Sequence, residues 1–290
     1  MAEQTTSEAQ DRRFHQMTEA PLEPLICKMA VPTIISMLIT SIYNMADTFF
    51  VGKLGTSATG AVGVVFPLMA LIQSIGFFFG QGSGSYISRQ LGAQHQEEAE
   101  RMAATGFFSA LITGILILVF GLLLRSPLCH LLGATETIYP YALAYMQIIL
   151  CGAPYMMAAL VLNNQLRQQG NATYAMVGLV SGGVLNIVLD PLFIFVLDLG
   201  ISGAAYATIL SQLISFLLLL LGIRLSRGVQ IRLRQFSPSI SRFAALAGGG
   251  LPSLCRQGLA SVAVTFLNTA ARPYGDAAIA AMSIVSRVSQ

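Results

Sequence analysis

The chain has 290 residues, of which 54% are hydrophobic and only 10% charged, with a formal net charge of +3 and a mean hydropathy of +0.69. About a quarter of the residues in a water-soluble domain are charged, so this composition excludes one and predicts an integral membrane protein. The uncharged runs are long enough for the roughly 20 residues that a spanning helix needs. We therefore predict an all-α membrane protein rather than a β-barrel.

Residues 1–22 are polar and lack the apolar core of a signal peptide, so they are predicted to form a disordered cytoplasmic tail. A first membrane span is predicted over about residues 24–50. Pro32 is expected to kink this span, because proline removes a backbone donor. Asp47 has two interpretations, a functional carboxylate inside the membrane or an acid wetted at the outer end of the span.

The next three spans are predicted over about residues 58–88, 102–124 and 137–162. The first of these carries glycines at helical spacing, which favours close packing of membrane helices. Its Gly-Gln-Gly-Ser-Gly stretch lacks the lysine of a phosphate-binding loop, so no nucleotide site is predicted. The last of the three ends in a polar cluster, residues 163–171, that is either a loop or a group of amides seeking partners.

The leading functional residue is Asp190, which lies in a fifth span predicted over about residues 172–197. A carboxylate at that depth is costly and normally faces a cavity. Asn186 precedes it by one helical turn, and Pro191 is expected to break the backbone pattern beside it. Thr208, in a sixth span over about 201–223, is a candidate hydroxyl neighbour or bonds only its own helix. Asn163 is a candidate amide within reach of the same pocket.

The basic residues indicate the orientation of the chain. Assigning alternate loops to opposite sides places eleven on one side, namely Arg12, Arg13, Lys28, Arg89, Arg101, Arg167, Arg224, Arg227, Arg232, Arg234 and Arg242, against Lys53, Arg125 and Arg272 on the other. The positive-inside rule makes the first side cytoplasmic. We therefore predict a multi-pass protein of the inner or plasma membrane with a cytoplasmic amino terminus. The basic linker is explained by this rule, and no nucleic-acid partner is predicted.

Metal and disulfide chemistry are not expected. Cys27, Cys129, Cys151 and Cys255 are scattered without a Cys-x-x-Cys pair, which predicts free thiols. The three histidines are solitary and lie in the tail or in loops. Two intramembrane aspartates raise the alternative of a membrane aspartyl protease, but Asp47 follows Ala46 and Asp190 follows Leu189, unlike the settings of such proteases. The chain is predicted not to be an enzyme.

An internal repeat is predicted at an offset of 220 residues. Ala30-Val31-Pro32-Thr33 resembles Gly250-Leu251-Pro252-Ser253, and the same offset pairs Gly55 with Gly275. Six spans separate the copies, so the two halves have parallel topology. The predicted divisions are a tail (1–22), a six-helix lobe (23–224), a basic linker (225–241) and the start of a second lobe (242–290) with a seventh span over about 243–271. A complete protein of this design has about twelve spans, so we expect the chain to be a fragment.

Four segments resemble the MATE (multidrug and toxic compound extrusion) family, in particular its DinF-like branch. They are Pro-Thr-x10-Asn-x2-Asp-Thr-x2-Val-Gly-x-Leu-Gly from Pro32 to Gly55, the Gly-Gln-Gly segment leading to Arg89-x3-Ala93, Asn-x3-Asp-Pro from Asn186 to Pro191, and Gly-Ile-x-Gly-Ala-Ala-x-Ala-Thr from Gly200 to Thr208.

The resemblance implies a proton- or sodium-coupled antiporter, without other cofactor, that exports amphipathic organic compounds or drugs by alternating access. It also implies a cation or proton site in the first lobe, formed by Asp47, Asn186, Asp190 and Thr208 with Asn163, and sodium at Asp47 and Asp190 is the one metal ion that this site allows. Pro32 corresponds to a bend in the first helix. A monomer in the lipid bilayer is expected. The alternative function is a lipid or lipid-linked oligosaccharide flippase of the same wider superfamily.

Overall fold

The computed structural model describes residues 21–226 and 228–288, and in this part of the chain every element is a helix. The predicted tail falls almost entirely on residues 1–20, outside the described residues. The elements are α2 (Leu22–Gly52), α3 (Thr56–Gly92), α4 (Gln96–Leu123), α5 (Arg125–Leu131), α6 (Tyr139–Gln168), α7 (Ala172–Pro191), the π-helical η1 (Leu192–Val196), α8 (Gly200–Leu225), the 3-10 turn η2 (Leu233–Gln235), α9 (Ile240–Ala271), the 3-10 turn η3 (Arg272–Tyr274) and α10 (Asp276–Val288).

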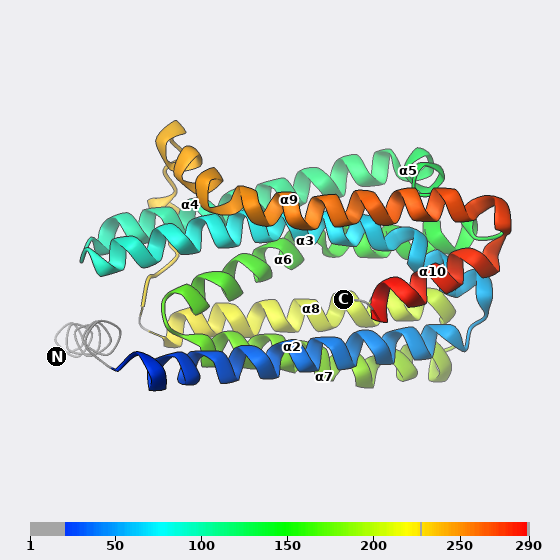
Figure 1. Cartoon of the computed structure of the whole chain (residues 1–290), viewed down its shortest axis with the longest axis horizontal. Helices are drawn as coiled ribbons and strands as arrows, with labels where there is room; N and C mark the ends of the chain where they lie inside the picture. The colour runs from blue at the N-terminus through cyan, green and yellow to red at the C-terminus, as the bar shows by residue number, and fades with distance from the viewer. Residues whose placement is uncertain (1–20, 227, 289–290) are drawn as a thin grey trace.

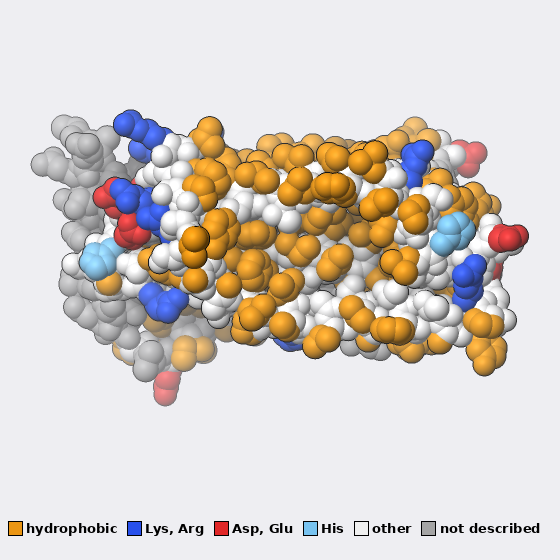
Figure 2. Space-filling model, turned by 90° about the horizontal axis from the view of Figure 1, so that it is seen from above, with side chains coloured by type: hydrophobic (Ala, Val, Ile, Leu, Met, Phe, Trp, Pro, Cys, Tyr) orange, Lys and Arg blue, Asp and Glu red, His pale blue; other side chains and the backbone are white. Residues whose placement is uncertain are grey.

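Six helices in the described residues are long and apolar enough to cross a membrane: α2, α3, α4, α6, α7 with η1, and α8. They match the six spans predicted from the uncharged runs. Figure 1 shows the long helices lying side by side along one axis. Figure 2 shows a band of hydrophobic side chains along the bundle, with charged side chains gathered at its two ends. The all-α membrane fold predicted from composition is therefore confirmed.

Helix α6 lies at the centre of the bundle and contacts α3, α4, α7 and α8. The fourth span does not end at residue 162, as predicted, but continues as helix through the polar cluster to Gln168. The buried amides have partners on neighbouring helices. Asn164 accepts from Gln81 Nε2 at 2.9 Å, and Gln165 donates to Ser83 Oγ at 3.0 Å. Residues 163–168 of the cluster are thus helical, and their amides join α6 to α3 and to α7.

Helix α9 packs along α3, as Figure 1 shows. Gly82 and Gly250 permit the contact, because a Cβ added to either would collide with a backbone carbonyl oxygen of the other helix. The predicted seventh span is a helix of 32 residues, but it is not among the six that meet the membrane-spanning composition. Polar residues such as Arg256 and Gln257 interrupt its apolar sequence.

The offset of 220 residues relates equivalent structural features. Pro32 lies inside α2 and Pro252 inside α9, and both helices lead into a turn that ends at a glycine with positive φ. Gly55 has φ 112° and Gly275 has φ 86°, and each is followed at once by a helix, α3 and α10. A left-handed backbone at both positions requires glycine. The shared geometry supports a duplication of this helix–turn–helix unit.

Candidate functional site

The deepest carboxylate in the described residues is on α7. Asp190 is 0% exposed, and Asn186, one turn earlier, is 4% exposed. The amide of Asn186 donates from Nδ2 to Asp190 Oδ1 at 3.2 Å. The sequence prediction that these two side chains share one helical face is confirmed. A donor held against the carboxylate stabilises a buried acid that otherwise has a large desolvation cost.

The helix changes its form directly after this carboxylate. Helix α7 ends at Pro191, and Leu192–Val196 continue as a π-helical turn. Proline cannot donate to the carbonyl one turn before it, and π-turns within helices occur frequently at functional sites. The turn is packed tightly, because a Cβ on Gly203 of α8 would lie 2.6 Å from the carbonyl oxygen of Phe193. Asp190 therefore lies where the regular helix ends.

A small cavity lies beside the Asn186–Asp190 pair, between α7, α8 and α2. Its volume is about 20 Å³, and roughly 10 to 15 Å³ is enough for one water molecule. Asn186 and Thr208 line it, and the same Asn186 side chain is hydrogen-bonded to Asp190. The complete lining is Tyr43, Leu179, Gly182, Gly183, Asn186, Thr208, Ser211, Gln212 and Ser215.

Two adjacent glycines bring the walls of this cavity together. A Cβ on Gly182 would lie 2.8 Å from Ser215 Cβ on α8, and one on Gly183 would lie 3.1 Å from Tyr43 on α2. Side chains at these positions would force the three helices apart. The glycines therefore keep the cavity as small as a single water molecule or monovalent ion.

Asp47 lies on α2 at the same height as Asp190 on α7. The two helices run parallel, with Tyr43 against Gly183 and the rings of Phe50 and Phe195 6.3 Å apart. Asp47 follows Tyr43 by four residues, which places it level with residue 187 of α7. It precedes Phe50 by three residues, which places it level with residue 192, so Asp47 lies level with residues 187 to 192. Asp47 is 7% exposed, so the interpretation as a wetted acid is not supported.

The other predicted residues have different positions. Thr208 lines the cavity, and its hydroxyl donates to its own helix at Ala204 O, which leaves lone pairs on that oxygen. Asn163 instead donates to Ala175 O at 2.9 Å. Ala175 precedes Asn186 by eleven residues, about 16 Å along a helix. The structure therefore brings Thr208 to the site and places Asn163 elsewhere.

Pro32 lies within α2, which continues through it without ending. The hydroxyl of Ser36 donates to Pro32 O at 2.8 Å, and Thr33 donates to Met29 O at 3.1 Å. Hydroxyls that bond back to the preceding turn are associated with bending of helices. The segment around Pro32 thus combines two features that weaken the regular backbone ladder.

Sequence reasoning did not assign Tyr43, Gln212 and Ser215 to the site. Gln212 is a polar residue inside an apolar span, which is a usable signal, and Ser215 follows Ser211 by one helical turn. Tyr43 gave no signal, because its contact with Gly183 depends on the packing of α2 against α7. The residues thus missed are those whose role depends on helix packing.

The side chains around the cavity offer oxygen atoms as ligands, and these can bind a proton, a water molecule or sodium. The Ser211 hydroxyl donates to Ala207 O and, like that of Thr208, keeps lone pairs for a cation. In the described residues no group of three His, Cys, Asp or Glu side chains could hold a transition metal. The four cysteines are all free thiols. Oxygen atoms of this kind are the ligands that hard cations prefer.

Comparisons with known proteins agree with this architecture. A family model described as MatE matches residues 32–192. The multidrug export protein MepA of Staphylococcus saprophyticus is 28% identical over 282 residues, which are 97% of this chain and 62% of that protein. MepA of Staphylococcus haemolyticus is 27% identical with the same coverage. The chain thus spans less than two thirds of the length of these curated relatives.

Solved structures show the same fold. A MOP superfamily transporter from Pyrococcus furiosus has a TM-score of 0.83 and 34% identity, covering 94% of this chain and 61% of that one. An inward-facing multidrug resistance MATE family transporter has a TM-score of 0.81 and 34% identity, covering 90% and 61%. The family model covers more than half of the 290 residues and includes Asp47, Asn186 and Asp190. The chain therefore belongs to the MATE family, a family of transporters rather than enzymes.

Proposed function

We propose that the chain acts in a cation-coupled multidrug exporter and contributes the lobe that binds the coupling ion. The ion, a proton or sodium, binds at Asp190 and Asn186 with Asp47 and Thr208 as neighbours. The exported compounds are amphipathic organic molecules, and the protein lies in the plasma membrane with its amino terminus in the cytoplasm. The names of the staphylococcal relatives, multidrug export proteins, support this choice.

The observation that carries the proposal is the buried Asn186–Asp190 pair beside a cavity of about 20 Å³. A carboxylate inside a membrane helix is costly and normally serves ion or proton movement. A bound cation neutralises the charge of the Asp190 carboxylate. The free energy of this binding depends on how closely the surrounding helices pack around the ion. An ion that binds two conformations unequally shifts the equilibrium between them.

The elements around the pair supply parts that change shape. The π-helical turn after Pro191 and the segment around Pro32 both interrupt regular helix hydrogen bonding. Both belong to helices that meet at the level of the two aspartates. Neutralising the carboxylates relieves repulsion between α2 and α7, and we infer that this lets α2 bend and reshape the drug cavity.

A flippase for lipids or lipid-linked oligosaccharides is the second candidate function. No feature of the ion site favours it over drug export, and the relatives are named as multidrug export proteins. Drug export therefore remains our proposal.

The proposal is tested with Asp190→Asn, which keeps the side-chain volume but removes the titratable charge. Infrared difference spectra of the purified chain, recorded while sodium or acid is added, report the change of a carboxyl group. We expect Asp190→Asn to lose that change. In cells that express the full-length transporter, we expect gradient-driven efflux of an amphipathic dye to fall at least about tenfold, equivalent to about 1.4 kcal/mol.

Asp198→Asn is the matched control, because Asp198 is an exposed acid only eight residues away, in the loop before α8. It should keep both the spectral change and the efflux. Retention of ion-coupled efflux by Asp190→Asn, or an equal loss in Asp198→Asn, would remove the proposed site.

A further inference from the structure

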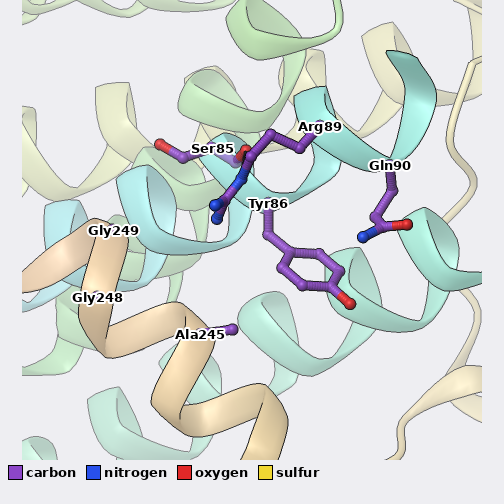
Figure 3. Close-up of a pocket in the computed structure, with 7 residues that line it drawn as sticks. All are labelled: Ser85, Tyr86, Arg89, Gln90, Ala245, Gly248 and Gly249. Atoms are coloured by element: carbon purple, nitrogen blue, oxygen red, sulfur yellow. Dashed lines mark hydrogen bonds between the residues drawn. The ribbon is translucent and has the colours of Figure 1, made fainter. Parts of the chain in front are cut away.

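A second, larger cavity lies between the end of α3 and the beginning of α9, and the ion site does not include it. Its volume is about 690 Å³, in the range of small-molecule binding sites. Ser85, Tyr86, Arg89 and Gln90 of α3 face Ala245 and Gly248 of α9 across it. Figure 3 shows the Arg89 side chain folding back along α3 toward α9, with the Tyr86 ring beside it.

Among the described residues no acid pairs with Arg89, whereas Arg101 and Arg242 at the same end of the bundle have acidic partners. Arg101 pairs with Glu97 and Glu98, and Arg242 pairs with Glu98 at 3.2 Å. The Nε of Arg89 donates to Ser85 O at 3.3 Å, and its guanidinium carbon lies 6.0 Å from the centre of the Tyr86 ring. The two terminal nitrogens of the guanidinium are therefore available to an anion.

The cavity lies at the end of the bundle where α3 stops and α9 begins. Arg89 lies in the last turn of α3, which ends at Gly92, and Gly248 lies in the third turn of α9. A Cβ on Gly248 would meet open space, so this glycine of α9 faces an unfilled part of the cavity. Leu251 and Leu259, which are 52% and 69% exposed, continue that face toward the middle of the bundle.

We propose that this cavity binds the headgroup of an anionic phospholipid. The guanidinium of Arg89 fits a phosphate with two parallel N–H donors. The side chains of Ser85, Tyr86 and Gln90 add neutral donors for the remaining oxygens, and an acyl chain follows the exposed leucines of α9. A free phosphate has no apolar part that could contact that face. A choline headgroup brings a cation that Arg89 repels. Basic pockets between membrane helices are known to hold anionic lipid headgroups.

The test uses the fact that the chain contains no tryptophan. Tyr86→Trp keeps an aromatic ring in the cavity and supplies a single fluorophore. The purified chain is placed in vesicles in which brominated phosphatidylglycerol or brominated phosphatidylcholine replaces part of the lipid, since bromine quenches tryptophan at contact. We expect half-maximal quenching at a several-fold lower fraction of brominated phosphatidylglycerol than of brominated phosphatidylcholine.

Two basic residues at the same end of the bundle provide the comparison. Arg89→Gln, added to Tyr86→Trp, should abolish the preference, whereas Arg224→Gln should leave it unchanged because Arg224 is exposed and does not line the cavity. Leu225→Trp, at a position 57% exposed, reports the lipid around the outer surface and should show no preference. Native mass spectrometry of the otherwise unmodified chain, with and without Arg89→Gln, checks the result without the reporter.

Three outcomes overturn the proposal. The first is equal quenching of Tyr86→Trp by both lipids, and the second is a preference that survives Arg89→Gln. The third is the same preference at Leu225→Trp, which would mean general attraction to the basic end of the bundle. If inorganic phosphate displaces brominated phosphatidylglycerol at equal concentration, the cavity binds a soluble anion and the lipid assignment is wrong.

Discussion

Two buried polar side chains on neighbouring helices illustrate how different roles arise at the scale of single residues. Asn163 is 6% exposed and Asp190 0% exposed. The amide of Asn163 bonds a backbone carbonyl of α7, so it joins two helices and stays neutral. The carboxylate of Asp190 accepts from Asn186, which lines a cavity, and we propose that a cation binds there and neutralises its charge. Burial alone does not distinguish the two cases.

This difference predicts the effect of Asn163→Ala. Loss of the hydrogen bond to Ala175 should lower the free energy of unfolding by about 1 kcal/mol, since interhelical hydrogen bonds in membranes contribute about 0.6 and at most about 1.7 kcal/mol. The infrared response to sodium or acid should be kept. Thermal unfolding in detergent measures the change in stability. Asp190→Asn should show the opposite pattern, with the stability kept and the infrared response lost. Unchanged stability with a lost ion response would place Asn163 in the ion site.

At the scale of elements, a single carboxylate holds the first turn of α10 against the rest of the bundle. Asp276 is the first residue of α10 and accepts hydrogen bonds from three hydroxyls, at 3.0 Å from Ser57, 2.7 Å from Thr135 and 2.6 Å from Thr137. Ser57 belongs to α3, and the two threonines precede α6. One carboxylate therefore attaches α10 to α3 and to the loop before α6.

This attachment predicts a pH-dependent stability. Burial raises the pKa of Asp276, but the hydrogen bonds from Thr137, Thr135 and Ser57 outweigh it, and the pKa lies below its ordinary value. A depressed pKa stabilises the fold above the unfolded value, about 3.9, and the contribution is lost as pH falls through the folded value. Asp276→Asn should cost about 1 kcal/mol at pH 7 and progressively less below about pH 4.

Thermal unfolding of the purified chain at pH 7 and at about pH 3 measures the effect. The control is Glu136→Gln, because Glu136 is an exposed acid in the same loop as Thr135 and Thr137. It should be neutral at both pH values. A deficit of Asp276→Asn that is as large at about pH 3 as at pH 7 would contradict the hydrogen-bonded carboxylate as its cause.

The elements that could be predicted from sequence are those fixed by hydropathy. Uncharged runs of sufficient length define spans, and all six were found, because a membrane helix must bury its whole backbone in its own hydrogen bonds. Span ends were missed where polar side chains bond across helices, as Asn164 does with Gln81. The short helix α5 and the π-turn η1 were also missed. Their form depends on neighbours rather than on periodicity.

The candidate site could be predicted in part for the same reason. Asp190 and Asn186 were found because one helical turn separates them on a single element. Tyr43 was not found, because its place depends on the register between α2 and α7, which glycine packing sets. Asn163 was assigned to the pocket by residue type and by the family resemblance, and the structure places its amide against Ala175 O instead.

At the scale of the whole molecule, charge is distributed unequally between the two ends of the bundle. Among the described residues, the end where α3 stops and α9 begins carries Lys28, Arg89, Arg101, Arg167, Arg224, Arg232, Arg234 and Arg242, while the opposite end carries Lys53, Arg125 and Arg272. The linker before α9 is held at the first end. The Gln235 side chain donates to Glu100, and the backbone N–H of Val229 donates to Gln169 Oε1 at 3.0 Å, while Arg242 in the first turn of α9 pairs with Glu98.

This asymmetry predicts the orientation of the protein, because basic loops are retained on the cytoplasmic side. The linker should face the cytoplasm and the turn after α2 the outside. Lys53→Cys and Arg232→Cys, both at exposed positions, are introduced separately into a chain whose four cysteines have been replaced. A membrane-impermeant thiol reagent added to intact cells should label Lys53→Cys and spare Arg232→Cys. After the membranes are opened, both should be labelled equally, which shows that both thiols are reactive. Labelling of Arg232→Cys alone in intact cells would show that the orientation is the reverse of the predicted one. The proposed direction of ion movement would then be reversed as well.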